Sequence, residues 1–157
     1  MPFHIAYYPS PIGLLELKAS ATHLVGIRVV DAMEKEYNES SAIIDICRRQ
    51  LNLYFANQLS EFTIPVHFSE NSSSFNSKVW QALMTIPYGS TVSYQKIATI
   101  IEHPHSERAI GNACRKNPLL VVFPCHRVVR TDGKLGGYVA GIEAKQYLLN
   151  MEQIKKS

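Results

Sequence analysis

The apolar run Leu119–Phe123 leads directly into Pro124-Cys125-His126-Arg127, and this junction constrains the chain more than any other stretch. Five consecutive apolar residues predict a buried strand. A cysteine at its end can be a small core residue, because free cysteine is among the most buried residue types. A neighbouring histidine can instead act as base or charge partner, and an adjacent arginine lowers the pKa of a thiol. We therefore interpret Cys125 first as a reactive thiol.

The length of 157 residues fits one typical domain or two small ones. Hydrophobic residues make up 46% and charged residues 18%, which favours a folded globular protein over a disordered one. No apolar stretch is long enough to span a bilayer, and the first residues lack the basic flank and apolar core of a signal peptide. We expect a cytoplasmic protein that does not bind membranes.

The three cysteines, Cys47, Cys114 and Cys125, are odd in number and far apart, so they predict reduced thiols and no disulfide framework. The six histidines are also scattered. No cysteine or histidine spacing matches a zinc site, and we expect neither a metal nor a cofactor.

Charge is divided unevenly along the chain. Residues 1–74 hold five basic and eight acidic residues, a net charge of −3, whereas residues 75–157 hold eleven and five, a net charge of +6. The second half is therefore the better polyanion-binding surface. An unevenly charged, solvated surface would give the same counts, so charge leaves both interpretations open.

The first part of the chain predicts a small sheet with one helix. Short connections between the strands favour antiparallel pairing. Apolar residues recur at helical spacing from Ile43 to Phe55, with Ser40 and Ser41 as possible caps. Residues 62–66 could add a strand, and the serine-rich link at 69–74 places a boundary between domains 1–70 and 71–157. The three strands are expected at Phe3–Tyr8, Leu14–Lys18 and Leu24–Val30.

The second part predicts helices. An apolar stripe from Phe75 to Met84 contains Trp80, which we expect to anchor the core. Two short helices with a tight join follow, and they have the dimensions of a helix-turn-helix. The pattern alone is not decisive, because many helical hairpins bind nothing. Ser93 and Ser106 are the expected caps, and the inward-facing residues are Ile97, Ala98, Ile100 and Ile101 on the first helix and Ala109, Ile110, Ala113 and Cys114 on the second.

The second of these helices has a composition that suits nucleic acid. Arg108, Arg115 and Lys116 are basic, and the small residues between them allow close approach to DNA. After the cysteine segment we expect a turn at Asp132-Gly133 and a last helix from Ile142 to about Ile154. That helix presents an apolar face of Ala144, Tyr147, Leu148 and Met151, with Lys145 and Glu152 as polar positions near it.

Direct contact between Cys125 and His126 is not expected in an extended segment, because adjacent side chains point to opposite faces. A bridging water or a turn at Pro124 would be needed to couple them. A carboxylate beyond the imidazole would then fix its tautomer, and Glu152 is the best placed candidate.

Five short motifs follow one another at these positions: Ile86-Pro87-Tyr88-Gly89, Val92-Ser93-Tyr94, Arg108-Ala109-Ile110-Gly111, Asn117-Pro118 and Pro124-Cys125-His126-Arg127-Val128-Val129. Together they resemble the O6-alkylguanine-DNA alkyltransferases, also called methylated-DNA–protein-cysteine methyltransferases. The resemblance is specific from about Phe75 to Glu152 and rests in the first half on Ser10-Pro11-Ile12-Gly13 and the strand–helix order. It implies an α/β (α+β) fold, with a small ribonuclease-H-like sheet and helix followed by a helical domain whose winged-helix-like helix-turn-helix carries the cysteine.

The same resemblance implies roles for individual residues. Cys125 would attack the alkyl carbon, His126 would act as its base through a water, and Glu152 would orient His126. Asn117 would brace the turn, and Tyr94 would help to protonate the departing guanine. Further pocket positions are Val128, Tyr138, Val139 and Lys145. Arg108 would enter the base stack in place of the flipped nucleotide, with Ser93, Gln95, Arg115 and Thr131 as other DNA contacts.

The implied activity is direct repair of O6-alkylguanine, and also of O4-alkylthymine, in duplex DNA bound through its minor groove. The product thioether at Cys125 cannot be hydrolysed, so each molecule acts once, as a monomer that can bind cooperatively along DNA. The segment 137–141 has no serine hydroxyl where some relatives have one, so the side-chain contact that this serine makes in those relatives is not expected here, and the preference among alkyl groups stays open. Two alternatives remain: a lesion-binding module without chemistry, and a Cys-His hydrolase that turns over.

Overall fold

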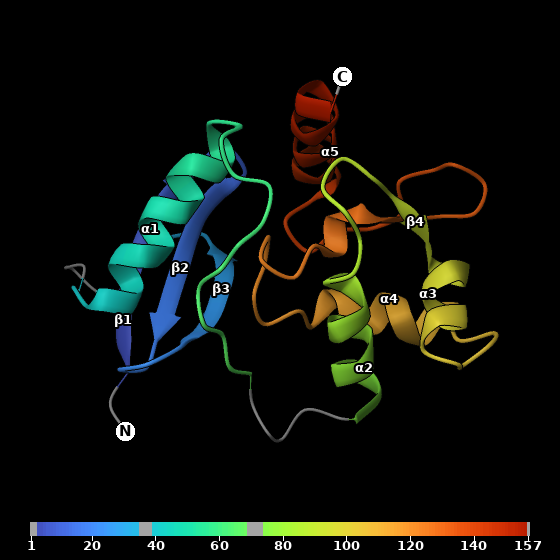
Figure 1. The fold of residues 1–157 in the computed structure, drawn as a ribbon, viewed down its shortest axis with the longest axis horizontal. Coiled ribbons are helices and arrows are strands. Elements are labelled where there is room, and N and C mark those ends of the chain that lie inside the picture. The colour runs from blue at the N-terminus through green and yellow to red at the C-terminus, as the bar shows by residue number, and fades with distance from the viewer. Residues whose placement is uncertain (1–2, 35–38, 69–73, 157) are drawn as a thin grey trace. The chain divides into compact units, whose positions relative to one another are not determined.

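The computed structural model describes residues 3–34, 39–68 and 74–156, which form two compact units (Figure 1). One unit comprises Met1–Glu70 with Pro118–Leu120, and the other comprises Asn71–Asn117 with Val121–Ser157. The predicted boundary and most of its serine-rich link fall on residues 69–73, outside the described residues. No described helix is both long enough and apolar enough to cross a membrane.

The first unit contains a three-stranded antiparallel sheet in the order β1-β2-β3, as predicted. The register pairs Ser10 with Gly13 across the turn between the first two strands. Ser10 tightens this turn, since its hydroxyl donates to the Gly13 carbonyl at 2.6 Å and accepts from Ile12 N–H at 3.2 Å. The strands span His4–Ser10 (β1), Gly13–Ala19 (β2) and Leu24–Val30 (β3).

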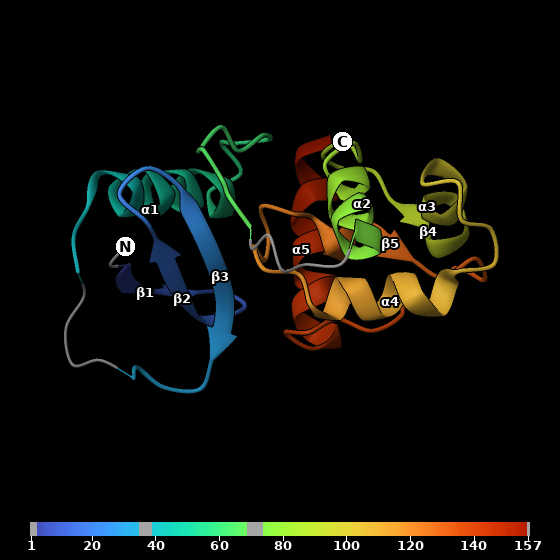
Figure 2. The same ribbon diagram turned by 90° about the horizontal axis from the view of Figure 1, so that it is seen from below.

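One helix, α1 (Ala42–Phe55), lies across one face of this sheet (Figures 1 and 2). Of the two candidate caps, Ser41 is the one at the N-cap, and its hydroxyl accepts from Ile44 N–H at 3.1 Å. Burial of its apolar stripe confirms the expected amphipathic helix. The buried residues are Ile43, Ile44, Cys47, Leu51 and Tyr54.

Two strands expected at residues 62–66 and 119–123 are wrong. The free edge of β3 instead makes isolated parallel bridges, from Leu24 to Val66 and from Ile27 to Leu119. The chain then turns at Val121, whose φ of 74° lies in the left-handed region that β-branched residues avoid. All five residues from Leu119 to Phe123 are buried, and a short apolar run cannot by itself distinguish a buried turn from a buried strand.

The second unit begins with α2 (Ser74–Leu83), which buries Val79, Trp80, Ala82 and Leu83. The Trp80 indole donates from Nε1 to the Ala113 carbonyl at 2.9 Å, so it anchors the core as expected. Met84 follows the helix and is exposed, contrary to the predicted stripe, because the helix ends one residue earlier.

The two short helices are α3 (Tyr94–Ile100) and α4 (Glu107–Arg115), which pack against each other and against α2 (Figure 2). Ser93 caps α3, as predicted, by accepting from Lys96 N–H at 3.0 Å. Ser106 occupies the N-cap of α4 but donates its hydroxyl to the His103 carbonyl, so the predicted side-chain cap is wrong. Ile100 and Ala109 are exposed and do not face inward, since helices of two turns bury only a narrow stripe.

The cysteine segment forms one turn of 3₁₀ helix, η1 (Cys125–Arg127), with Pro124 at its N-cap, so of the conformations considered the chain adopts the turn at Pro124 and not the extended one. It leads into β5 (Val128–Val129), which pairs in parallel with β4 (Val92–Ser93). The turn at Asp132-Gly133 follows as predicted. The last helix, α5 (Ile142–Lys156), packs against η1 (Figure 1). Its buried face includes Ala144, Leu148 and Met151, whereas Tyr147 is exposed.

Candidate active site

The turn that carries Cys125 is held by Asn117, the residue that follows α4 and its C-cap. The Asn117 amide donates to the Phe123 carbonyl at 2.7 Å and to the Cys125 Sγ at 3.2 Å. Backbone bonds from Cys125 N–H to the Phe123 carbonyl, and from Arg127 N–H to the Pro124 carbonyl, close the turn. One amide side chain therefore fixes both the backbone and the thiol.

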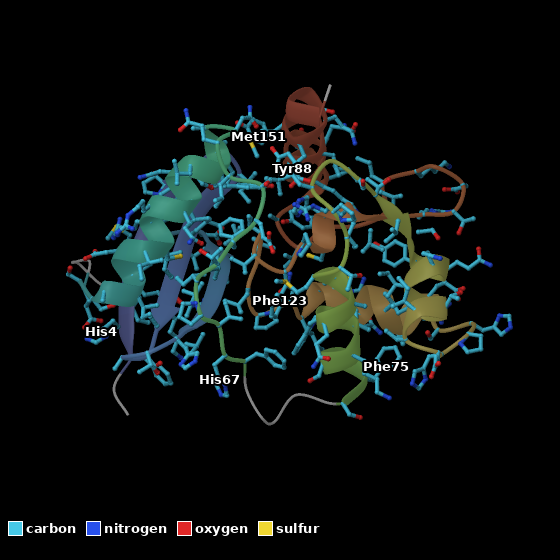
Figure 3. All side chains as sticks on the ribbon, viewed as in Figure 1. His4, His67, Phe75, Tyr88, Phe123 and Met151 are labelled. Atoms are coloured by element: carbon cyan, nitrogen blue, oxygen red, sulfur yellow. The ribbon has the colours of Figure 1, made fainter. Side chains whose placement is uncertain are left out.

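Behind the thiol lies a buried ionic cluster. His126 Nε2 is 2.7 Å from Glu152 Oε2, and the Arg127 guanidinium contacts both oxygens of the same carboxylate at 2.8 and 3.1 Å. Arg127 also donates to the Ile86 carbonyl at 2.8 Å, and its guanidinium carbon lies 5.6 Å from the centre of the Tyr88 ring. Figure 3 shows Tyr88 in the loop after α2, close to α5.

Sequence reasoning missed Arg127 as the partner of Glu152, having treated it as a charge that acts on the thiol. The signal was available, because a carboxylate proposed for a buried position needs a cation beside it. His126, Arg127 and Glu152 are all buried, and together they satisfy that requirement.

Protonation in this cluster follows from burial and pairing. Burial lowers the pKa of His126 more than Glu152 raises it, so the imidazole is neutral near pH 7. Burial raises the pKa of Glu152, but hydrogen bonds from His126 and Arg127 outweigh it and lower the pKa to about 2. The site therefore presents a neutral imidazole oriented by a charged carboxylate.

The Cys125 thiol is not pre-ionised. Burial raises its pKa to about 11, and the opposing effects of the Asn117 hydrogen bond and the Lys145 charge do not compensate. The expected lowering by Arg127 is wrong, because that guanidinium points to Glu152 and Ile86. Ionisation of this thiol therefore requires a base.

A cavity of about 200 Å³ opens onto the thiol. Its lining brings together several residues that the resemblance singled out, and it adds Cys114, which sequence reasoning assigned to the helix core only. No sequence signal separates a core cysteine from one at a cavity wall. The lining residues are Tyr94, Gly111, Cys114, Arg115, Cys125, Gly137, Tyr138 and Val139.

Lys145 supports this cavity from behind its wall. The side chain is fully buried, and Nζ donates to the carbonyls of Val128, Leu135 and Gly137 at 2.7, 2.5 and 3.1 Å. An ammonium has three protons to donate, and three backbone carbonyls accept them. Lys145 therefore ties β5 to the loop before α5, while Val128 contributes its carbonyl to this network.

The Tyr94 hydroxyl lies close to the backbone at Gly136. A Cβ atom at Gly136 would lie 3.1 Å from Tyr94 Oη, and Gly136 has a φ of 75°, which also favours glycine. Burial raises the pKa of Tyr94 to about 12, so its hydroxyl stays protonated and can donate. Tyr138 also keeps a buried hydroxyl, for which the described residues supply no hydrogen-bond partner.

The residues expected to contact DNA are distributed over two helices and a loop. Arg108 and Gln95 are exposed on α4 and α3, whereas the Ser93 hydroxyl is used in capping. Arg115 is exposed at the end of α4 and donates to Asn112. Thr131 lines a second cavity of about 360 Å³. Among the described residues, no three His, Cys, Asp or Glu side chains gather in a way that could hold a metal ion.

Comparisons with known proteins match both units. Residues 3–68 match the family model described as 6-O-methylguanine DNA methyltransferase, ribonuclease-like domain, and residues 74–154 match the one described as 6-O-methylguanine DNA methyltransferase, DNA binding domain. A methylated-DNA–protein-cysteine methyltransferase of Mycolicibacterium paratuberculosis is 42% identical over 92% of this chain and 88% of its own. One of Methanosarcina acetivorans is 34% identical over 95% and 97%.

Solved structures agree with these matches. The O6-methylguanine methyltransferase of Mycobacterium tuberculosis superposes with a TM-score of 0.87 at 36% identity, covering 98% of this chain and 94% of its own. The structure of the same organism's OGT in complex with DNA gives a TM-score of 0.87 at 37% identity over 97% and 94%. On these matches and on the fold described above, the chain belongs to the 6-O-methylguanine DNA methyltransferase family, the methylated-DNA–protein-cysteine methyltransferases.

Proposed function

We propose that the protein repairs DNA by moving the alkyl group of O6-alkylguanine onto Cys125 Sγ. One observation carries the proposal: the thiol opens onto a cavity, and the next residue of the same turn, His126, lies 2.7 Å from the carboxylate of Glu152 on α5. The family and the DNA complex of the Mycobacterium tuberculosis relative support it. O4-alkylthymine presents the same alkyl–oxygen bond, so we include it among the substrates.

Activation of the thiol begins with the neutral imidazole. With Nε2–H donated to Glu152, the Nδ1 lone pair of His126 accepts the Cys125 proton through one bridging water. The charged carboxylate stabilises the imidazolium that forms. The thiolate then attacks the alkyl carbon, the carbon–oxygen bond breaks, and the electron pair leaves on the guanine.

Two tyrosines of the cavity wall are placed to receive the leaving base. Tyr94 and Tyr138 both line the cavity, and the phenol of Tyr94, with its pKa raised to about 12, keeps its proton at neutral pH. Donation from Tyr94 to a ring nitrogen lowers the cost of the negative charge that develops on guanine. Val128, Val139 and Lys145 shape and support the wall that faces the base.

The alkylated product is a thioether, and water does not cleave the carbon–sulfur bond as it would a thioester. Cys125 is therefore consumed, and each molecule acts once. Asn117 holds the turn throughout, because its amide bonds the backbone as well as the sulfur.

The damaged base enters the cavity when its nucleotide rotates out of the duplex. We propose that a monomer places α4 in the minor groove and that exposed Arg108, in its first turn, occupies the stack when the nucleotide rotates out. Gln95, Arg115 and Thr131 are also exposed, and in this proposal they contact the sugar-phosphate backbone of the DNA. Ser93 positions α3 through its cap.

Intact-mass analysis after incubation with an O6-methylguanine duplex tests the proposal. We expect the mass to rise by one methyl group, located at Cys125, and the Cys125→Ser variant to bind the duplex without gaining mass. An unchanged wild-type mass with tight binding would instead identify a lesion-binding module. Repeated turnover of an ester or amide, without alkylation, would identify a hydrolase.

A further inference from the structure

The second cavity, of about 360 Å³, carries an ion pair that the proposed reaction does not use. Its lining residues are Tyr94, Glu107, Arg130, Thr131 and Asp132. Tyr94 also lines the reaction cavity, and Thr131 is among the proposed DNA contacts, so this cavity lies on the surface where DNA would bind. Arg130 has no role in the proposed chemistry.

Arg130 and Asp132 belong to one tight turn. Arg130 Nη2 lies 2.9 Å from Asp132 Oδ2, and the other carboxylate oxygen accepts from Lys134 N–H at 3.0 Å. Backbone bonds from Gly133 N–H to the Arg130 carbonyl and from Arg130 N–H to the Lys134 carbonyl close the turn. Asp132 is thus held by the backbone, whereas the guanidinium is attached only by a long side chain.

The charges of this cavity oppose DNA binding as they stand. Two carboxylates, Glu107 and Asp132, face one guanidinium, which leaves a net charge of −1 against a phosphate. The Arg130 and Asp132 side chains are 56% and 44% exposed, so their ion pair is solvated and weak. A DNA phosphodiester carries the same single negative charge as the carboxylate, offers the guanidinium a bidentate partner and can displace Asp132.

We propose that Arg130 is a DNA-backbone contact that Asp132 holds in the free protein. When duplex DNA binds, the guanidinium leaves the carboxylate and pairs with a phosphodiester. Asp132 therefore weakens binding to every duplex, because each encounter must break the ion pair. This inference rests on the proposed function, since it requires that DNA occupy this surface.

The salt dependence of binding to an undamaged duplex tests the exchange, with three variants compared. Arg130→Gln should reduce the slope of log K against log salt by about 0.9, the loss of one phosphate contact. Asp132→Asn, whose amide oxygen can still accept from Lys134 N–H, should tighten binding about two- to fivefold with the wild-type slope. Arg49→Gln, which removes an exposed charge on α1, should change neither quantity.

If the ion pair stayed intact on DNA, Arg130→Gln would keep the wild-type slope and Asp132→Asn would steepen it, and either result overturns the proposal. The proposal is also overturned if Asp132→Asn leaves the affinity for the undamaged duplex unchanged or lowers it. Methyl transfer to Cys125, measured on the same preparations, separates this failure from that of the proposed function. A wild-type protein that transfers methyl but shows no Arg130 effect refutes the exchange alone.

Discussion

At the scale of single residues, the site combines one neutral nucleophile with a pre-oriented base. Cys125 has its pKa raised to about 11 by burial, and His126 has its pKa lowered by burial, so neither carries charge at rest. The charged groups are the Glu152 carboxylate and the Arg127 guanidinium, which contact each other, and Glu152 also contacts His126. In the proposed reaction the thiol therefore becomes a thiolate only when the imidazole accepts its proton through a water.

The free energy of unfolding should fall at acid pH because Glu152 and His126 become protonated. The pKa of Glu152 is lowered to about 2 when folded, so its stabilisation is complete above about pH 4.5 and is lost as pH falls towards 2. The loss amounts to roughly 3 kcal/mol. His126, with a lowered pKa, adds a loss that begins below its ordinary value of about 6.5.

Urea unfolding of wild type and Glu152→Gln between about pH 7 and pH 3 measures these contributions. The variant should be less stable at neutral pH, because Arg127 loses its carboxylate, and the difference should narrow as pH falls. A difference that stays constant down to pH 3 would show that Glu152 titrates normally in the folded protein.

A single methyl group at Gly136 should disturb Tyr94. Its Cβ would meet Tyr94 Oη at 3.1 Å, whereas a Cβ at Gly141, which also has a positive φ, meets nothing within 4 Å. We therefore expect Gly136→Ala to slow alkyl transfer about ten- to hundredfold by moving the proton donor, and Gly141→Ala, which introduces the same kind of backbone strain, to have little effect on it. Equal rates in the two variants would argue against a role for Tyr94.

At the scale of elements, the sequence predicts regular structure well where periodicity and caps agree. The strand Leu24–Val30 and the helix capped by Ser41 lie where the pattern placed them. It fails from Leu119 to Phe123, because the local signal for a buried run does not include the left-handed turn at Val121. A turn at Pro124 is only one of the two possibilities that the local sequence leaves open, because the Asn117 amide that holds it lies outside the segment.

The N-cap of α1 provides a matched pair of serines. Ser41 accepts from Ile44 N–H at 3.1 Å, whereas Ser40 is exposed and precedes the cap. Ser41→Ala should cost about 1 kcal/mol in the free energy of unfolding, and Ser40→Ala only a few tenths. Chemical denaturation of both variants measures this, and equal losses would refute the cap.

Arg108, in the first turn of α4, should affect the rate of alkyl transfer mainly when the damaged base must leave a duplex. Arg108→Ala should slow repair in duplex DNA more than reaction with free O6-benzylguanine, because only the duplex requires rotation of the nucleotide. Arg49→Ala, on α1, serves as the control for loss of one positive charge. Equal slowing on both substrates would count against Arg108 as the residue that fills the stack.

At the scale of the whole molecule, the charge distribution and the family match single out the same half of the chain as the proposed DNA-binding half. Residues 75–157, with a net charge of +6, include all but the first of residues 74–154, which match the DNA binding domain of the family. The motifs name the residues that we propose to carry the reaction, but their geometry is not predictable from the sequence. The Arg127–Glu152 contact and the three carbonyls around Lys145 join positions that sequence spacing does not relate.

Titration of the protein with a duplex whose O6-methylguanine carries an isotopically labelled methyl group tests the central claim most directly. We predict that labelled protein increases in proportion to the DNA added and stops at one methyl group per molecule, all of it on the Cys125 peptide. Continued demethylation beyond one equivalent, or a label on any other residue, would contradict single-use transfer to Cys125.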